Sequence, residues 1–263
     1  MSEIVALVGK FISNPPFILC ILVLGYLGGD RSKFARVITS VLFATILTSL
    51  LKSIFKLPLP PGNNEGWSFP SGHTITNMVL WFSIAIEYRN KIFSLLGVVA
   101  CATTIFALIY YNYHYLIDII GGIVISITWL ALFQFIIKKW RGKKEYHVTI
   151  LLAIISMIIN YYNCSPSDWK YNLWVANAML FGFGLGWVII SPNKININNN
   201  KIFKLFRILI GVTGLLIIYF IFEHLEVNID HNIMAFFEFF LLSFWISFFT
   251  ERILKHLNKI LST

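Results

Sequence analysis

Long apolar runs separated by short polar breaks recur along the whole chain. Several of them are long enough, or nearly long enough, to cross a hydrocarbon layer of about 30 Å, which takes about 20 residues of helix. The nine runs cover residues 15–29, 34–51, 72–87, 92–112, 115–137, 147–161, 172–191, 203–222 and 232–250. This pattern predicts an all-α fold, a polytopic membrane helix bundle of about nine transmembrane helices.

The polar breaks also suggest how the chain is divided. Residues 1–13 precede two prolines, have no room for a crossing of their own and lack the cleavage site of a signal peptide, so we expect an interfacial helix there. A basic linker at 138–147 separates the first five spans from the last four. We therefore predict a core at 1–140 and a C-terminal four-span membrane extension at 141–263.

The basic residues predict how the bundle is oriented. With nine spans, 17 of the 21 lysines and arginines fall on one side, and only Lys10, Lys52, Lys56 and Lys170 fall on the other. Cytoplasmic loops accumulate lysine and arginine. We therefore expect an N-terminus outside, a cytoplasmic C-terminus and a location in the bacterial inner (plasma) membrane.

Composition agrees with the membrane assignment and narrows the list of partners. Hydrophobic residues make up 57% of the chain and charged residues 13%, whereas a soluble domain has about a quarter charged residues. The net charge of +9 is then explained by the orientation of the chain in the membrane and by contact with phospholipid headgroups, so no nucleic-acid partner is expected. Cys20, Cys101 and Cys164 have no metal-ligand spacing, and we predict no metal site, no disulfide and no cofactor.

Two features on the predicted outward side are suited to binding a phosphate. Ser71 and Gly72 stand where the third span begins, and the free N–H groups and positive dipole of a helix N-terminus favour an anion. Lys52 and Lys56 lie one helical turn apart before a run of prolines, and a lysine can neutralise non-bridging phosphoryl oxygens. We predict that Lys52, Ser71 and Gly72 bind substrate, with Lys56 as a further candidate that could instead face lipid headgroups.

Two histidines and a carboxylate complete the candidate site. His114 and Asp118 are spaced i, i+4 at the start of the fifth span and so share one helix face. A carboxylate on one imidazole nitrogen fixes the tautomer and makes the other nitrogen a better nucleophile or base. His73 is suited to protonate a leaving oxygen. Since all these pieces fall on the same side of the membrane, we predict one active site.

These residues resemble the type-2 phosphatidic acid phosphatase superfamily, whose motifs are K-x6-R-P, P-S-G-H and S-R-x5-H-x3-D. The second motif is intact at residues 70–73, His114 and Asp118 match the end of the third, and Lys52 matches the first lysine. The resemblance covers about residues 15–140. It implies metal-independent chemistry in which His114 attacks phosphorus to give a phosphohistidine, Asp118 supports His114, and His73 protonates the leaving group.

The chain departs from these motifs at both arginines. Leu59 stands where the first motif has its arginine, and Leu108 and Ala107 stand where the third has arginine and serine. A bidentate arginine–phosphate pair in a water-poor site is worth about 10²–10⁴ in rate. The predicted site is therefore short of two positive charges.

Four functions are compatible with this pattern. The first is a lipid phosphatase or phosphotransferase that acts on a membrane lipid phosphate or phospholipid at the extracytoplasmic face. The second is a sphingomyelin-synthase-like transferase that passes a phospho-headgroup to a lipid or glycan acceptor, since a phosphodiester needs less neutralisation than a monoester dianion. The third is a sugar phosphatase of the glucose-6-phosphatase type. The fourth is a non-enzymatic lipid binder or transporter with a degenerate site.

Overall fold

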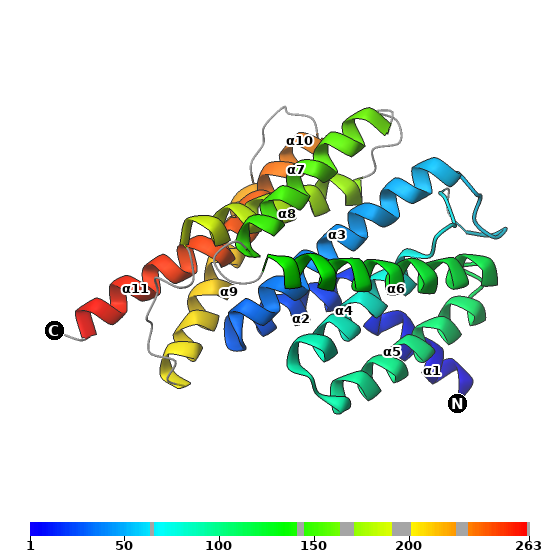
Figure 1. Ribbon diagram of the computed structural model, residues 1–263, viewed down its shortest axis with the longest axis horizontal. Coiled ribbons are helices and arrows are strands. Elements are labelled where there is room, and N and C mark those ends of the chain that lie inside the picture. The colour runs from blue at the N-terminus through cyan, green and yellow to red at the C-terminus, as the bar shows by residue number, and fades with distance from the viewer. Residues whose placement is uncertain (64–65, 141–144, 164–170, 191–200, 225–230, 262–263) are drawn as a thin grey trace.

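The computed structural model describes residues 1–63, 66–140, 145–163, 171–190, 201–224 and 231–261, and this part of the chain is built of helices (Figure 1). The first half contains α1 (Ser2–Ile12), α2 (Pro15–Gly28), α3 (Arg31–Phe55), α4 (Gly72–Tyr88), α5 (Lys91–Tyr110) and α6 (Leu116–Lys139). The second half contains α7 (Glu145–Asn163), α8 (Tyr171–Ile190), α9 (Lys201–Glu223), α10 (His231–Phe244), the π-helical turn Trp245–Phe249 and α11 (Thr250–Leu261).

A helix occupies each of the nine predicted spans, and the all-α membrane bundle is confirmed. Within the described ranges, six helices are long and apolar enough to cross a membrane on their own. They are α3, α5, α6, α8, α9 and the continuous helix from His231 to Lys259. Helix α4 has only 17 residues, and the apolar part of α7 is also short. The count of nine crossings therefore remains a prediction.

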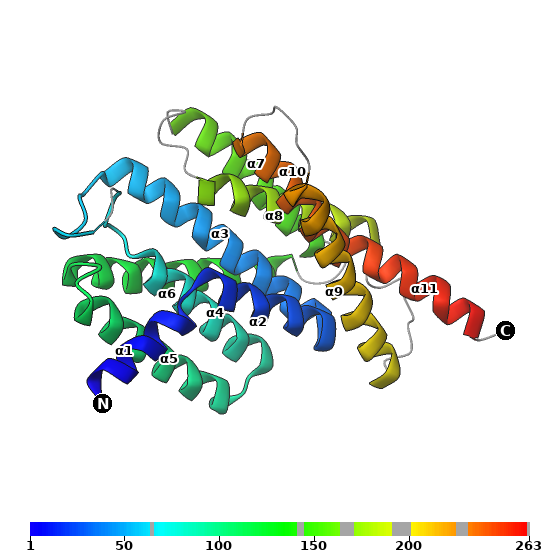
Figure 2. The same ribbon diagram turned by 180° about the vertical axis from the view of Figure 1, so that it is seen from behind.

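The N-terminal segment is a helix, as expected, but it is packed into the bundle. Helix α1 lies along α5 so closely that a Cβ atom added at Gly9 would lie 2.0 Å from the carbonyl oxygen of Thr103. Two prolines follow in the first turn of α2, a position that tolerates them. Helices α1 and α2 meet at a bend of 56° and together are long and apolar enough for one broken span (Figure 2).

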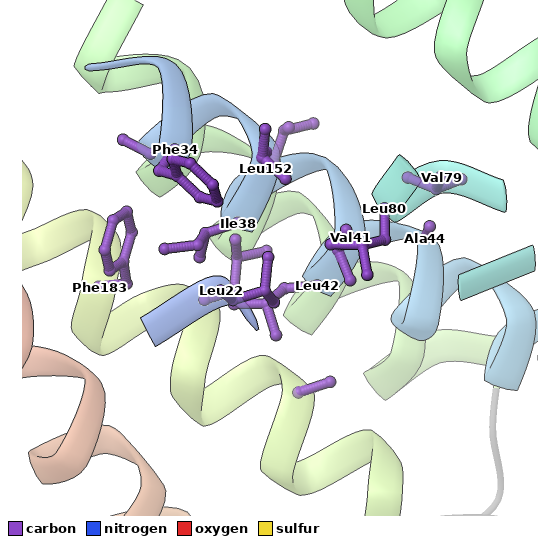
Figure 3. Packing of buried hydrophobic residues seen from close by; sticks show 14 of the residues in the cluster. Leu22, Phe34, Ile38, Val41, Leu42, Ala44, Val79, Leu80, Leu152 and Phe183 are labelled. Atoms are coloured by element: carbon purple, nitrogen blue, oxygen red, sulfur yellow. The ribbon is translucent and has the colours of Figure 1, made fainter. Parts of the chain in front are cut away.

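Helix α3 is the centre of the bundle. It packs against α2, α4 and α6 from the first half and against α7 and α8 from the second. Figure 3 shows this shared core, with Ile38 and Val41 of α3 among side chains such as Leu22 of α2, Leu152 of α7 and Phe183 of α8. The two predicted parts thus share one hydrophobic core, and the division at residue 140 remains a prediction.

A buried charged group also joins the two halves at the end of the bundle where α3 begins. Glu251 of α11 is fully buried and forms ion pairs with Arg31 of α3 and with Arg207 of α9, whose Nε lies 3.0 Å from the Glu251 Oε1 atom. Arg207 also donates to the carbonyl oxygen of Leu27, at 3.4 Å. These contacts connect the predicted extension to α2 and α3.

Candidate active site

The loop after α3 turns back on itself to deliver the chain to the start of α4. Helix α3 ends at Phe55, and its cap residue Lys56 has a left-handed backbone with φ of 49°. The Ser68 N–H then donates to the Leu57 carbonyl at 2.7 Å, and Pro58 pairs with Trp67. The Lys52 side chain fastens the same loop, because its ammonium donates to the Trp67 carbonyl at 2.7 Å. Lys52 is therefore held beside the residues that lead into α4.

Close packing of α6 against this loop brings the two histidine-bearing segments together. The Ser71 N–H donates to the backbone carbonyl of Asp118 at 3.1 Å. At Gly122, an added Cβ would lie 3.2 Å from the Ser71 carbonyl oxygen, and at Gly121 it would lie 2.2 Å from the Phe69 ring. The two glycines after Asp118 thus allow α6 to approach the start of α4.

His114 and Asp118 pair as their spacing predicts. The His114 Nδ1 lies 3.4 Å from Asp118 Oδ2, and the same oxygen accepts from the Tyr115 N–H at 2.9 Å. The Asp118 side chain is fully buried in the first turn of α6, where the helix dipole favours a negative charge. With Nδ1 directed at the carboxylate, Nε2 of His114 is the nitrogen left for chemistry.

His73 is the second histidine of the site. Its ring centroid lies 6.4 Å from that of His114, with 62° between the ring planes. The His73 side chain is exposed and lines a small cavity of about 110 Å³. The lining residues are Lys10, Ser13, Asn14, His73, Ala107, Leu108 and Tyr113. The two predicted catalytic histidines are therefore neighbours, and His73 lies at the edge of this cavity.

Ser71 and Gly72 have different roles at the start of α4, where phosphate binding is predicted. Ser71 is fully buried and caps α4: its hydroxyl accepts from the Thr74 N–H at 3.4 Å, while its own N–H is bonded to Asp118. The N–H groups of Gly72 and His73 are in the first turn, where no intrahelical acceptor is available. An anion at this helix start would thus contact the N–H groups of Gly72 and His73, while Ser71 caps the helix.

The two predicted lysines differ in their relation to the histidines. Burial, together with the positive charge of Lys52, lowers the pKa of His114 to about 4, against the opposing effect of the Asp118 carboxylate. His114 is consequently neutral at neutral pH, as a nucleophile must be. Lys56, the cap residue after α3, is exposed and is not among the residues that line the cavity.

Sequence reasoning missed the part of the cavity that α1 and the α5–α6 turn provide. Lys10, Ser13 and Asn14 come from the N-terminal segment, and Tyr113 directly precedes His114. One signal was available, since Lys10 is one of only four basic residues on the predicted outward side. Leu108, at the position of a motif arginine, is buried and lines the same cavity.

Comparison with known families gives two matches. The model of the PAP2 superfamily matches residues 33–142, and the model described as PAP2 superfamily phosphatase, transmembrane extension, matches residues 174–256. Nothing matches among the curated proteins or among the solved structures. The first match contains Lys52, His73, His114 and Asp118, and the second covers the segment from α8 into α11.

Proposed function

This chain belongs to the PAP2 superfamily and is an integral membrane protein of phosphatase type, and from that premise we propose that it cleaves a phosphoester of a lipid at the extracytoplasmic face through a phosphohistidine. The observation that carries the proposal is the pairing of His114 with Asp118, 3.4 Å apart, beside His73.

The proposed reaction has two steps that these residues share. Nε2 of His114 attacks phosphorus, the bond from phosphorus to the lipid oxygen breaks, and His73 gives a proton to the departing oxygen. Water then attacks the phosphohistidine, His73 takes a proton from it, and inorganic phosphate leaves with His114 restored. Asp118 stabilises the positive charge that the imidazole gains during attack.

Electrostatics support this division of roles. A neutral His114 keeps its lone pair down to about pH 4, the pKa to which burial and Lys52 bring it. Lys52 and the N–H groups of Gly72 and His73 face the negative charge of the phosphoryl group.

A lipid substrate is supported by the surroundings of the site. Leu116 and Ile117, between His114 and Asp118, are 61% and 60% exposed, and Ile109 near the end of α5 is 53% exposed. In a membrane bundle, exposed apolar side chains of this kind contact lipid. A phosphorylated lipid can therefore approach the site from the bilayer, with its apolar part against these helices.

A second candidate function follows from the missing arginines. With leucine at 59 and 108, fewer positive charges meet the phosphate, which favours a phosphodiester with a single negative charge. In that reaction a lipid or glycan acceptor replaces water and receives the phospho-headgroup.

Purified protein incubated with labelled lipids tests both functions. A lipid phosphomonoester and a phospholipid diester are each supplied with and without an acceptor, alongside a soluble sugar phosphate. Release of free phosphate from the monoester without an acceptor supports the phosphatase, while product formed only with an acceptor supports the transferase. Preference for the sugar phosphate would contradict the lipid assignment.

His114→Ala and His73→Ala are the matched variants for this experiment. We expect His114→Ala to abolish turnover. Because phosphohistidine is labile in acid and stable in alkali, rapid quenching at alkaline pH should trap the label on the wild-type chain and not on His114→Ala. Full turnover by His114→Ala would refute the catalytic assignment. Loss of activity on adding EDTA would contradict a metal-independent reaction.

A further inference from the structure

We infer that Lys10 of α1 is a substrate-binding residue that supplies positive charge where the motif arginine is replaced by Leu108. This inference rests on the proposed function and deepens it, because it concerns how the same site neutralises a phosphate. It also gives the N-terminal helix a role in the chemistry.

The first observation is the position of the Lys10 ammonium. It donates to the phenol oxygen of Tyr113 at 3.0 Å and lies 5.5 Å from the ring centroids of both Tyr111 and Tyr113. Tyr113 is the residue before His114, and Lys10 lines the same cavity as His73. A cation is thus held by the residue that precedes the proposed nucleophile in the sequence, and it lines the same small cavity as the proposed acid.

The second observation is that Lys10 and Leu108 meet at this cavity from neighbouring helices. Leu108 is 2% exposed and lines the cavity from α5, the helix along which α1 lies. Leucine can neither bond to a phosphate oxygen nor neutralise it. An ammonium on the adjacent helix can do both, since a lysine is a point charge on a flexible stem with three donors.

The third observation is that the end of α1 is fastened where this role requires it. The Asn77 amide of α4 donates to Thr104 Oγ1 of α5 at 2.8 Å, and that hydroxyl donates to the Gly9 carbonyl at 3.4 Å. Ser13 Oγ donates to the same carbonyl at 2.9 Å. Together with the close approach at Gly9, these bonds hold the backbone next to Lys10 against α5, which carries Leu108 and is itself bonded to α4, the helix of His73.

This second cation changes the expected substrate class. Lys52 and Lys10 together place two positive charges around the phosphate, which suits the nearly dianionic headgroup of a phosphomonoester. Of the two reactions proposed above, the inference therefore favours hydrolysis of a lipid phosphomonoester over transfer from a diester.

Orthovanadate, a phosphate-shaped anion, tests Lys10 without requiring turnover. Its dissociation constant is measured on detergent-solubilised full-length wild type, Lys10→Gln and Lys10→Arg, together with kcat/KM for a lipid phosphomonoester. Removal of a charge-assisted hydrogen bond to an anion costs about 10- to 100-fold in affinity. We expect that loss for Lys10→Gln in both measurements, and affinity close to the wild type for Lys10→Arg.

Second-site rescue is the most specific test. Leu108→Arg places the motif arginine back on the cavity wall, and we expect it to restore vanadate binding and kcat/KM to Lys10→Gln. Lys91→Gln, which removes an exposed lysine at the opposite end of α5, is the control and should leave both unchanged. Melting temperatures of all variants check that the bundle stays folded.

The outcomes separate this inference from the proposed function. An active wild type whose Lys10→Gln variant binds vanadate equally well overturns the inference and leaves the phosphatase in place. A wild type that neither binds vanadate nor turns over any phosphoester contradicts the proposed function itself.

Discussion

Asp118 connects the two histidine-bearing segments through three contacts that its side-chain and backbone oxygen atoms make. Its carboxylate lies against His114 and accepts from the Tyr115 N–H, while its backbone carbonyl accepts from Ser71 at the cap of α4. One residue therefore orients the proposed nucleophile and joins α6 to the start of α4. Substitutions that keep its shape separate the first role from the second.

Asp118→Asn is expected to remove the charge and preserve the packing. The amide can still accept from the Tyr115 N–H, but it cannot stabilise an imidazolium, so kcat should fall by about 10²–10⁴. Steady-state kinetics with a lipid phosphomonoester, together with the melting temperature, check this. A variant that loses its fold along with its activity would show that Asp118 acts mainly by holding α6.

Lys52 sets the pH range of the reaction through His114. Burial and Lys52 lower the pKa of His114 to about 4, and a protonated imidazole cannot attack phosphorus. Replacing Lys52 with glutamine removes one of these causes, so the pKa of His114 rises and the acid limb of kcat/KM should move to higher pH. The measurement is a pH profile of kcat/KM for wild type and Lys52→Gln.

Lys52→Arg is the matched control for that profile, because it keeps the charge. We also expect Lys52→Gln to lower the plateau of kcat/KM by about tenfold or more, since a charge facing the phosphoryl group is lost. An unmoved acid limb in Lys52→Gln would show that another group sets it.

At the scale of the elements, the site depends on how closely α6 approaches α4. Gly121 and Gly122 follow Asp118 by one turn, and side chains at either position would meet Phe69 or the Ser71 carbonyl. A small residue is therefore required at this contact, for packing and not for backbone freedom. Without it, the His114–Asp118 pair would be displaced from His73.

Gly122→Val should consequently impair both folding and chemistry. Its Cβ would lie 3.1 Å from Thr74 Cβ and its branches would reach further, so we expect a loss of about 1–3 kcal/mol in the free energy of unfolding and a fall in kcat. Unfolding in mixed micelles and steady-state kinetics measure the two effects.

Gly28→Ala provides the comparison for the glycine variant. There the added methyl would meet only the end of the Ile208 side chain at 3.3 Å, which can move aside. This variant should retain wild-type kcat. Equal losses in the two variants would mean that the α4–α6 contact has no special importance.

At the scale of the whole molecule, the two halves are joined by a shared core and by the buried cluster of Arg31, Arg207 and Glu251. Two guanidinium groups meet one carboxylate in this cluster, and Glu251 is fully buried. Both guanidinium groups depend on Glu251 for neutralisation, because nearby cations in a site of low dielectric repel each other strongly.

Glu251→Gln should destabilise the whole bundle. Breaking a buried ion pair by removing one partner costs about 3–5 kcal/mol, because the remaining charges are uncompensated. We expect that loss in the free energy of unfolding, with little change in kcat of the folded protein, since the cluster joins the start of α3 and the site lies near its end. Glu3→Gln, at an exposed carboxylate, should cost less than about 1 kcal/mol.

Agreement between sequence and structure is best where the signal is local. Hydropathy over about 20 residues depends only on the chain itself, and each predicted span contains a helix. The His114–Asp118 pair was also predictable, because residues four apart share a helix face. Lys52 was predicted from its charge and its position on the outward side, whereas its bond to the Trp67 carbonyl in the following loop was not.

Contacts between distant segments were beyond sequence reasoning. The sequence of the N-terminal 13 residues predicts an interfacial helix. In the structure, Gly9 allows α1 to pack on α5, and this packing brings Lys10 to Tyr113, 103 residues later in the sequence. No periodicity reports such a contact, because it depends on the shapes of two helix surfaces and not on the pattern of either one.

The sequence by itself determined the class of protein, the succession of helices and the chemical groups available, because apolar length and motif spacing are properties of neighbouring residues. Only the tertiary structure decided which groups share a cavity. Packing of α1 on α5 and of α6 on the start of α4 brought Lys10, Leu108 and His73 to one cavity and set His114 beside His73. These arrangements follow from close packing between helix surfaces, and each contact surface is formed by residues that lie far apart in the chain.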